Sequence, residues 1–376
     1  MDRRTFHRRL LALGGLTAAG ALFGGPASTA AGHGEGAPCR RSVVEHALPP
    51  AAETHEIVKL PDRPMALVSQ MSNSRLVKLA LDPDTEQVTG VEAFALGAAD
   101  SMLHGLAVSS RIPGRIWATH EGGNRLLLVD PVADALDATP RVEREIAVPG
   151  GGQGPHYVSE YGDMLWVTLK GSDQVLALDH TRPERYRLFQ AESHPIFAAQ
   201  HPVSGEFYVS QDGASSVLRI DPVSGRTAQM PIPADRGSTP VGLISGAGGV
   251  WVVLLGTAQA GTGAFGRIDE NGQIAWHRLG APQGRSAGLL HLAFDPPGSA
   301  HGREPGLWLL GSSIVSDTAQ DLIIRVRFDS SWTRIIGEEY ALLPTQRCKA
   351  HRLLPLHNSV LATELTTATV AQWTRC

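Results

Sequence analysis

A motif that recurs along the chain constrains its fold more than any other feature. In the copy that spans 104–130, a short opening segment with a histidine precedes an apolar run ending on Trp117, a polar turn, and a second apolar run closing on Asp130. Later copies close on Asp179, Asp221, Asp269 and Asp329, so the successive spacings are 49, 42, 48 and 60 residues. A period of this length is typical of one four-stranded blade of a β-propeller.

The number of copies predicts the number of blades. Seven copies can be counted, at 65–82, 104–130, 155–179, 195–221, 240–269, 290–329 and 350–373. The last copy has no residues left for an outer strand, whereas a short alternating strand, 56–60, precedes the first copy. We therefore predict an all-β, seven-bladed propeller that is closed by an N-terminal strand joining the last blade, with six or eight blades as the alternatives. A closed ring leaves no long sheet edge exposed, which favours a monomer.

Two kinds of residue recur inside the repeat. Each of five copies has an aromatic residue in its first apolar run, and we interpret these residues as packing between blades, with ligand stacking as the alternative: Trp117, Trp166, Tyr208, Trp251 and Trp308. The closing aspartates are interpreted as turn residues, because an aspartate before proline initiates turns through its side chain.

The N-terminus carries the features of an export signal. Arg3 and Arg4 form a twin arginine, 10–23 is apolar and rich in Gly and Ala, and small residues follow at 27–31. We predict a Tat-type signal peptide at 1–31, a polar arm at 32–55 and the propeller at 56–376, with a short membrane anchor as the alternative. The predicted location is outside the cytoplasm, either secreted or in the cell envelope.

The net charge and the cysteine content of the chain argue against several classes of function and site. Loss of 1–30 removes four arginines and one aspartate, which takes the formal charge from −4 to −7. Such a chain has no basic surface for nucleic acid, and no other run is long enough to span a membrane. The three cysteines, Cys39, Cys348 and Cys376, predict one disulfide and one leftover thiol, with the pairing open. A zinc site is disfavoured because no Cys/His spacing typical of zinc is present.

The opening segments of the copies differ in whether, and where, they contain a histidine. We expect the second residue of each opening segment to face the mouth of the central channel, and these residues are His104, His156, Val241, His291 and His351, with His194 one position earlier in its own copy. Histidine serves there as a general base or metal ligand, or it hydrogen-bonds the backbone of a neighbouring blade.

Two stretches carry a family resemblance. The segment from His351 to Leu361-Ala362-Thr363-Glu364 and the segment from His104 to Trp117-Ala118-Thr119-His120-Glu121 resemble the virginiamycin B (streptogramin) lyases. The resemblance implies a seven-bladed propeller that opens the ester-closed ring of a cyclic depsipeptide by elimination, with a histidine base and a magnesium ion held by glutamates.

The resemblance assigns roles to individual residues that occupy matching positions in this sequence. It implies that His351 is the base, that Glu364 is a magnesium ligand, and that His291, with His104 and His156, contacts a small-molecule or cyclic-peptide substrate. The family's second metal-binding glutamate is replaced by Lys349, which repels a cation. Either Glu121 substitutes for it or no metal binds. Insertions at 258–263 and 312–320 are predicted to be flexible loops that cover a ligand.

Two other functions compete with the lyase. A lactone hydrolase would need calcium held by carboxylates in the channel, and few carboxylates fall in the opening segments. A non-enzymatic propeller that binds a peptide, glycan or protein on its rim is the main alternative, because propellers host both catalysts and scaffolds.

Overall fold

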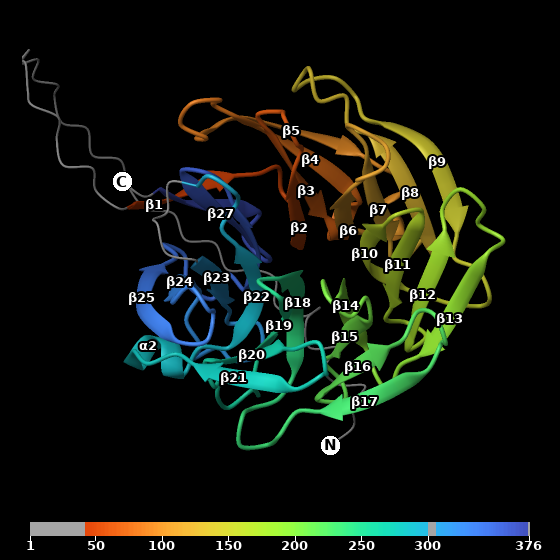
Figure 1. Ribbon diagram of the computed structural model, residues 1–376. Coiled ribbons are helices and arrows are strands. Elements are labelled where there is room, and N and C mark those ends of the chain that lie inside the picture. The colour runs from red at the N-terminus through yellow and green to blue at the C-terminus, as the bar shows by residue number, and fades with distance from the viewer. Residues whose placement is uncertain (1–41, 300–305, 375–376) are drawn as a thin grey trace, which may run out of the picture. The chain divides into compact units, whose positions relative to one another are not determined.

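The strands of this protein form seven separate antiparallel sheets arranged in a ring. A computed structural model describes residues 42–299 and 306–374, and in these residues every sheet has four strands (Figure 1). The predicted seven-bladed propeller is therefore confirmed. The predicted signal peptide at 1–31, Cys39 and Cys376 lie outside the described residues.

Blades 1 to 4 follow one another along the chain, each running from its inner to its outer strand. Blade 1 consists of β2 (Thr54–Lys59), β3 (Met65–Gln70), β4 (Arg75–Leu81) and β5 (Val88–Ala95). Blade 2 consists of β6 (Leu103–Val108), β7 (Ile116–His120), β8 (Arg125–Asp130) and β9 (Arg141–Ala147). Blade 3 consists of β10 (Pro155–Tyr161), β11 (Met164–Leu169), β12 (Gln174–Asp179) and β13 (Tyr186–Gln190). Blade 4 consists of β14 (Pro195–Gln200), β15 (Phe207–Gln211), β16 (Ser216–Ile220) and β17 (Thr227–Pro231).

The remaining blades continue the ring. Blade 5 consists of β18 (Pro240–Gly246), β19 (Gly249–Leu254), β20 (Ala264–Ile268) and β21 (Ile274–Arg278). Blade 6 consists of β22 (Leu289–Phe294), β23 (Gly306–Gly311), β24 (Leu322–Phe328) and β25 (Ile335–Leu342). Blade 7 consists of β26 (Ala350–Pro355), β27 (Ser359–Glu364), β28 (Thr369–Thr374) and β1 (Ser42–Ala47). Within the described residues, three short helices lie in connections: η2 (Met71–Asn73), η3 (Ala99–Ser101) and α2 (Pro282–Arg285).

An N-terminal strand closes the ring, as predicted, but it is not the strand expected. β1 pairs antiparallel with β28 along its full length, from Ser42 opposite Thr374 to Ala47 opposite Thr369. This strand falls inside the segment predicted as a polar arm. The strand expected at 56–60 instead belongs to β2, the inner strand of blade 1. β1 has alternating exposed and half-buried residues, as an outer strand should, whereas the first four residues of β2 are buried.

The recurring aromatic and aspartate residues have the packing roles predicted for them. Trp117, Trp251 and Trp308 are fully buried, and the Trp166 ring stacks on Phe207 of the next blade with ring centroids 3.5 Å apart. The carboxylate of Asp221 accepts hydrogen bonds from the backbone N–H groups of the turn that follows it. Burial of these rings between blades supplies apolar contact that a single sheet could not make alone.

A belt of hydroxyl groups joins consecutive blades near the channel. In five blades the second strand has a Ser or Thr whose hydroxyl accepts a hydrogen bond from an inner-strand N–H of the same blade. The same hydroxyl donates to an inner-strand carbonyl of the next blade. These residues are Ser69, Thr119, Thr168, Ser210 and Thr363. Because both partners are backbone groups, the belt fixes the inner strands relative to one another.

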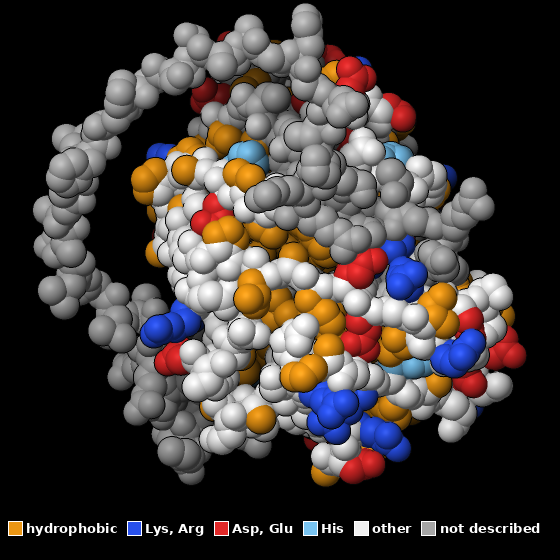
Figure 2. All heavy atoms as spheres, turned by 90° about the vertical axis from the view of Figure 1, so that its left-hand side faces the viewer, with side chains coloured by type: hydrophobic (Ala, Val, Ile, Leu, Met, Phe, Trp, Pro, Cys, Tyr) orange, Lys and Arg blue, Asp and Glu red, His pale blue; other side chains and the backbone are white. Residues whose placement is uncertain are grey.

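The outer flank of the ring is mixed in charge. Figure 2 shows Lys and Arg side chains beside Asp and Glu side chains on the flank that it presents, with apolar atoms between them. No helix within the described parts of the chain is long and apolar enough to cross a membrane.

Candidate functional site

The start of each inner strand defines one face of the ring, which we call the mouth face. Because strands alternate in direction within a blade, the connection into an inner strand and the turn between its second and third strands lie on this same face. In Figure 1 the inner strands β2, β6, β10, β14, β18 and β22 surround the centre of the ring. Side chains at the start of these strands therefore surround the mouth of the channel.

The second residues of the inner strands form a ring that we call the mouth layer. Strand register identifies these residues. In each blade the first residue of the inner strand pairs with the last residue of the second strand, and a bulge follows directly after this pair. The members are His55, His104, His156, Ile196, Val241, Leu290 and His351. The four histidines come from the adjacent blades 7, 1, 2 and 3, whereas the apolar residues come from blades 4, 5 and 6.

The four histidine rings touch in a continuous series. Ring centroids are 4.4 Å apart for His351 and His55, 4.2 Å for His55 and His104, and 3.9 Å for His104 and His156. Burial lowers the pKa of all four well below the usual range, and the positive charge of Arg352 adds to this effect. All four imidazoles are therefore neutral at pH 7, the form that accepts protons and binds metal ions.

Glu121 brings a carboxylate to one end of this series. Its Oε2 lies 3.0 Å from Nδ1 of His156 and 4.0 Å from Nε2 of His104. Nδ1 of His104 lies 2.7 Å from the carbonyl oxygen of His156, so this nitrogen carries the proton and Nε2 has the free lone pair. Glu121 directly follows β7, where its backbone N–H donates to the carbonyl of Met102.

His351 and His55 occupy the other end of the series. Neither ring nitrogen of His351 has a hydrogen-bond partner among the described residues, and the same holds for Nδ1 of His55. Both side chains are buried. Unpaired buried polar atoms are uncommon and often mark a site that binds a ligand or ion.

A second ring of residues, which we call the plug layer, fills the channel below the histidines. Its members are the third residues of the inner strands: Glu56, Gly105, Tyr157, Phe197, Gly242, His291 and Arg352. Arg352 of blade 7 forms an ion pair of 3.1 Å with Glu56 and places its guanidinium over the Phe197 ring of blade 4, 4.6 Å from the centroid. Blades 7 and 4 are not neighbours, so this contact crosses the channel. Arg352 and Phe197 therefore close part of the channel below the mouth layer.

Two predicted histidines lie away from the histidine series. His291 belongs to the plug layer, where its Nδ1 accepts a hydrogen bond from the N–H of Leu353, and Leu290 takes the position expected for it. His194 is 46% exposed in the connection before β14 and lies 3.5 Å from Asp212. This carboxylate raises the pKa of His194, the opposite direction to the mouth histidines.

The resemblance assigns Glu364 and Glu121 to magnesium. Glu364, at the end of β27, accepts hydrogen bonds from the hydroxyls of Thr367 and Thr369, and burial raises its pKa to about 7. Two groups of side chains place their donor atoms within 4.8 Å of one another: His55, His104 and His351, and His104, Glu121 and His156. Neither contains Glu364, so the magnesium ion stays a prediction.

Glu53 lies close enough to Glu121 and Lys349 for their charges to change its pKa. Burial raises the pKa of Glu53, the negative charge of Glu121 raises it further, and the positive charge of Lys349 lowers it. Lys349 therefore lies close to Glu53. Its backbone N–H donates to the hydroxyl of Ser313 in the loop after β23.

The insertion at 312–320 folds toward the apolar half of the mouth. Ile314 and Val315 pack against the hydrophobic cluster that contains Ile196, Val241 and Leu290. The loop begins with a hydrogen bond from Ser312 N–H to the carbonyl of Gly288. The predicted location over the mouth is consistent with these contacts.

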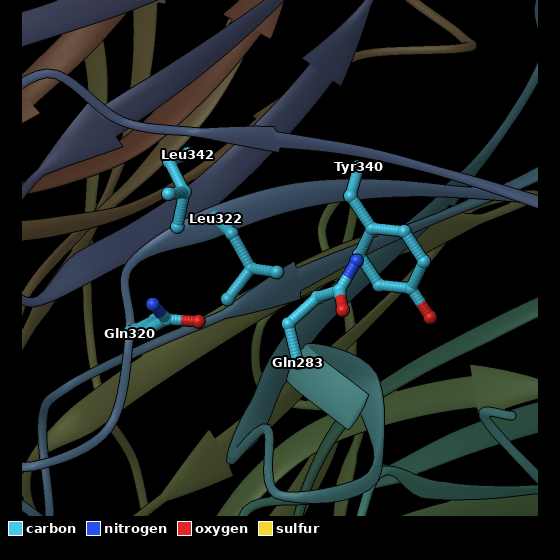
Figure 3. Close-up of a pocket in the computed structure, with 5 residues that line it drawn as sticks. All are labelled: Gln283, Gln320, Leu322, Tyr340 and Leu342. Carbon is cyan, nitrogen blue, oxygen red and sulfur yellow. The ribbon is translucent and has the colours of Figure 1, made fainter. Parts of the chain in front are cut away.

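A pocket of about 320 Å³ lies farther out on blade 6. Figure 3 shows its lining residues, Gln283 of α2, Gln320, Leu322 of β24, and Tyr340 and Leu342 of β25. None of the predicted site residues lines it. The mouth, with its buried ionisable groups, is the better candidate for a functional site.

Sequence analysis missed His55, because blade 1 was expected to lack a histidine in its opening segment. His55 stands 10 residues before the second strand of its blade, compared with 12 for His104 and 8 for His156. This spacing was visible in the sequence. It was overlooked because the strand beginning at Glu56 was assigned to ring closure.

Comparison with known proteins gives structural but no sequence relatives. No protein-family model and no curated protein matches this chain. Selenomethionine-substituted virginiamycin B lyase from Staphylococcus aureus aligns over 90% of this chain and 100% of its own, with a TM-score of 0.66 and 16% identity. A streptogramin B lyase aligns over 89% and 97%, with a TM-score of 0.65 and 19% identity.

A protein of different description is nearly as similar. Hydrazine synthase from Kuenenia stuttgartiensis aligns over 88% of this chain and 98% of its own, with a TM-score of 0.63 and 16% identity. Identities this low leave the choice of chemistry to the side chains at the mouth. The comparisons therefore establish that this chain has the seven-bladed propeller fold found in the streptogramin lyases.

Proposed function

We propose that this protein is a carbon–oxygen lyase that opens an ester-closed ring, such as that of a cyclic depsipeptide, by elimination, with His351 as the base. The likeness in fold to the streptogramin lyases supports the reaction class. The observation that carries the proposal is His351 itself, which is buried at the mouth with no hydrogen-bond partner on either ring nitrogen among the described residues.

The environment of His351 suits transient proton transfer. Burial and the charge of Arg352 lower the pKa of His351, so its imidazole is neutral and ready to accept a proton. The same effects make the imidazolium a strong acid, which returns the proton readily. Because a lowered pKa also weakens the base, the reaction depends on stabilisation of the enolate as well as on His351.

The reaction balances without water. The imidazole of His351 takes a proton from the carbon next to a carbonyl, and the electron pair forms an enolate. Collapse of the enolate forms a carbon–carbon double bond and expels the ester oxygen from the adjacent carbon as a carboxylate. The imidazolium then gives up its proton, so the product is a linear isomer of the substrate.

The apolar half of the mouth supplies a surface for the rest of the ring. Ile196, Val241 and Leu290 lie opposite the histidines, and Ile314 and Val315 pack against their cluster. Apolar contact there would hold a hydrophobic ring while its ester faces His351.

The test is incubation of the purified protein with a type B streptogramin, followed by mass spectrometry. Elimination leaves the mass of the antibiotic unchanged but gives a linear product with a new fragmentation pattern, whereas hydrolysis adds the mass of water. His351→Ala should lower the rate by about 10²–10⁴-fold.

His194→Ala is the matched control, because His194 is exposed in the connection before β14 and lies outside the histidine series. It should keep the wild-type rate. An antibiotic left intact by the wild-type protein, or a His351→Ala variant as active as the control, contradicts the proposal.

A further inference from the structure

One end of the histidine series has the composition of a transition-metal site. His104, His156 and Glu121 each offer a donor atom, and these atoms lie within 4.8 Å of one another. We propose that these three residues bind a single divalent transition metal ion, such as Zn²⁺, Mn²⁺ or Fe²⁺, at the mouth of the channel. Binding of the ion does not depend on the lyase activity proposed above.

The distances require only small side-chain movements. Donor atoms around one ion, with bonds of about 2.0–2.2 Å, lie about 3–3.5 Å apart. Glu121 Oε2 is already 3.0 Å from His156 Nδ1, and it is 4.0 Å from His104 Nε2. The Glu121 side chain is 19% exposed, so this end of the histidine series reaches solvent.

The backbone around His104 prepares this side chain as a ligand. Nδ1–H donates to the carbonyl oxygen of His156, which leaves Nε2 unprotonated and without a hydrogen-bond partner among the described residues. A ligand histidine typically donates its other ring N–H in this way. Gly105 permits the arrangement, because a Cβ at this position would lie 2.6 Å from the carbonyl oxygen of His156.

The donor set decides the class of ion. Two imidazoles and one carboxylate suit Zn²⁺, Mn²⁺ or Fe²⁺, whereas Mg²⁺ prefers oxygen donors and retained water. Glu53 lies close to Glu121, whose negative charge adds to burial in raising the pKa of the Glu53 carboxyl. A bound cation would offset this repulsion.

The competing group, His55, His104 and His351, is less suited to an ion. All three side chains are buried, and the group contains no carboxylate to balance a divalent charge. The positive charge of Arg352 acts on the histidines of both groups, so the Glu121 carboxylate is what distinguishes the proposed site. A buried, uncompensated cation beside an arginine is costly.

The experiment is a metal titration of the full chain after chelator treatment, without substrate. Co²⁺ serves as the probe because its visible absorption reports coordination, and Zn²⁺ binding is measured by calorimetry with Mg²⁺ as a competitor. We expect one ion per chain, with excess Mg²⁺ causing no displacement. Glu121→Gln and His156→Gln should each weaken binding at least 10²-fold.

His55→Gln is the matched control, because it alters the same histidine series without removing a proposed ligand. It should change the affinity by less than about threefold. Circular dichroism and thermal unfolding confirm that each variant is folded, and Glu121→Gln, at a partly exposed position, serves if His156→Gln does not fold.

Two results would overturn the site. The first is the absence of saturable binding. The second is binding that survives Glu121→Gln but is lost in His55→Gln, which places the ion in the competing group. Stoichiometric Co²⁺ binding that depends on Glu121, in a protein that leaves streptogramins intact, would retain the metal site and reject only the proposed lyase activity.

Discussion

The two halves of the mouth layer share one backbone frame and differ completely in side-chain chemistry. Blades 7, 1, 2 and 3 contribute four buried histidines, whereas the same position in blades 4, 5 and 6 holds Ile196, Val241 and Leu290. The bulge recurs in every inner strand, so neither strand geometry nor register separates the halves. The difference lies in the residues alone.

This contrast shows how a repeat fold places the reactive side chains of a site in some blades and its apolar contact surface in others. The histidine half places proton acceptors and possible metal ligands next to Glu121. The apolar half packs against the loop after β23. The plug layer joins the halves, since Arg352 of blade 7 reaches Phe197 of blade 4. Changes to this bridge and to each half should therefore have separate effects.

The largest effect is expected from breaking the bridge. Arg352→Met removes the partner of buried Glu56 and the contact with Phe197. An uncompensated buried carboxylate should lower the free energy of unfolding by about 3–5 kcal/mol, measured by urea denaturation.

Arg111→Met is the control for this exchange, because the Arg111–Asp163 pair is half exposed on both sides. It should cost less than about 1 kcal/mol. Equal losses in the two variants would mean that the bridge does not stabilise the ring.

A smaller effect is expected from placing a histidine in the apolar half. Val241→His puts an imidazole where the surrounding cluster offers only apolar partners, including Ile314 and Val315. The expected loss in free energy of unfolding is about 2–3 kcal/mol. Val203→His, at a position 63% exposed, should have almost no effect. A tolerated Val241→His would show that the apolar half is polar or hydrated in solution.

The smallest effect concerns His194, the exposed histidine next to the apolar half. Its pKa is raised by Asp212, so the pair stabilises the fold below pH 6.5 and this stabilisation is lost as the pH rises through the raised value. Asp212→Asn should therefore cost about 0.5 kcal/mol at pH 5.5 and nothing at pH 8.5, measured by thermal unfolding. Asp163→Asn should show no such pH dependence, since its partner is an arginine. A loss that is equal at both pH values would contradict the assignment.

The repeat made most of the fold predictable. The period of the closing aspartates and the aromatic residues determined the seven blades, and the short final copy predicted closure by an N-terminal strand. Which strand closes the ring was not predictable from alternation alone. The sequence of 42–47, Ser-Val-Val-Glu-His-Ala, does not alternate polar and apolar residues, and the pairing partner of β1 lies more than 320 residues away.

The candidate site was predictable only in part. His104, His156 and His351 lie together as expected, because the repeat places the same position of every blade at the mouth. His291 does not join them, because it is the third residue of β22 and Leu290 occupies the second position, which faces the mouth. The contacts of Glu121 with His156 and of Glu364 with two threonines depend on loop conformations that the repeat does not encode.

Closure of the ring by β1 has a consequence for how the protein is made. β28, the partner of β1, lies more than 320 residues later in the chain, and at about 5–20 residues per second it is synthesised roughly 20–60 s after β1. During that interval six blades can assemble in order while blade 7 remains open and its partner strand waits unpaired. A chain that stops before Thr369 would keep those six blades and never close. Completion of the ring thus requires that both β1 and β28 have been synthesised.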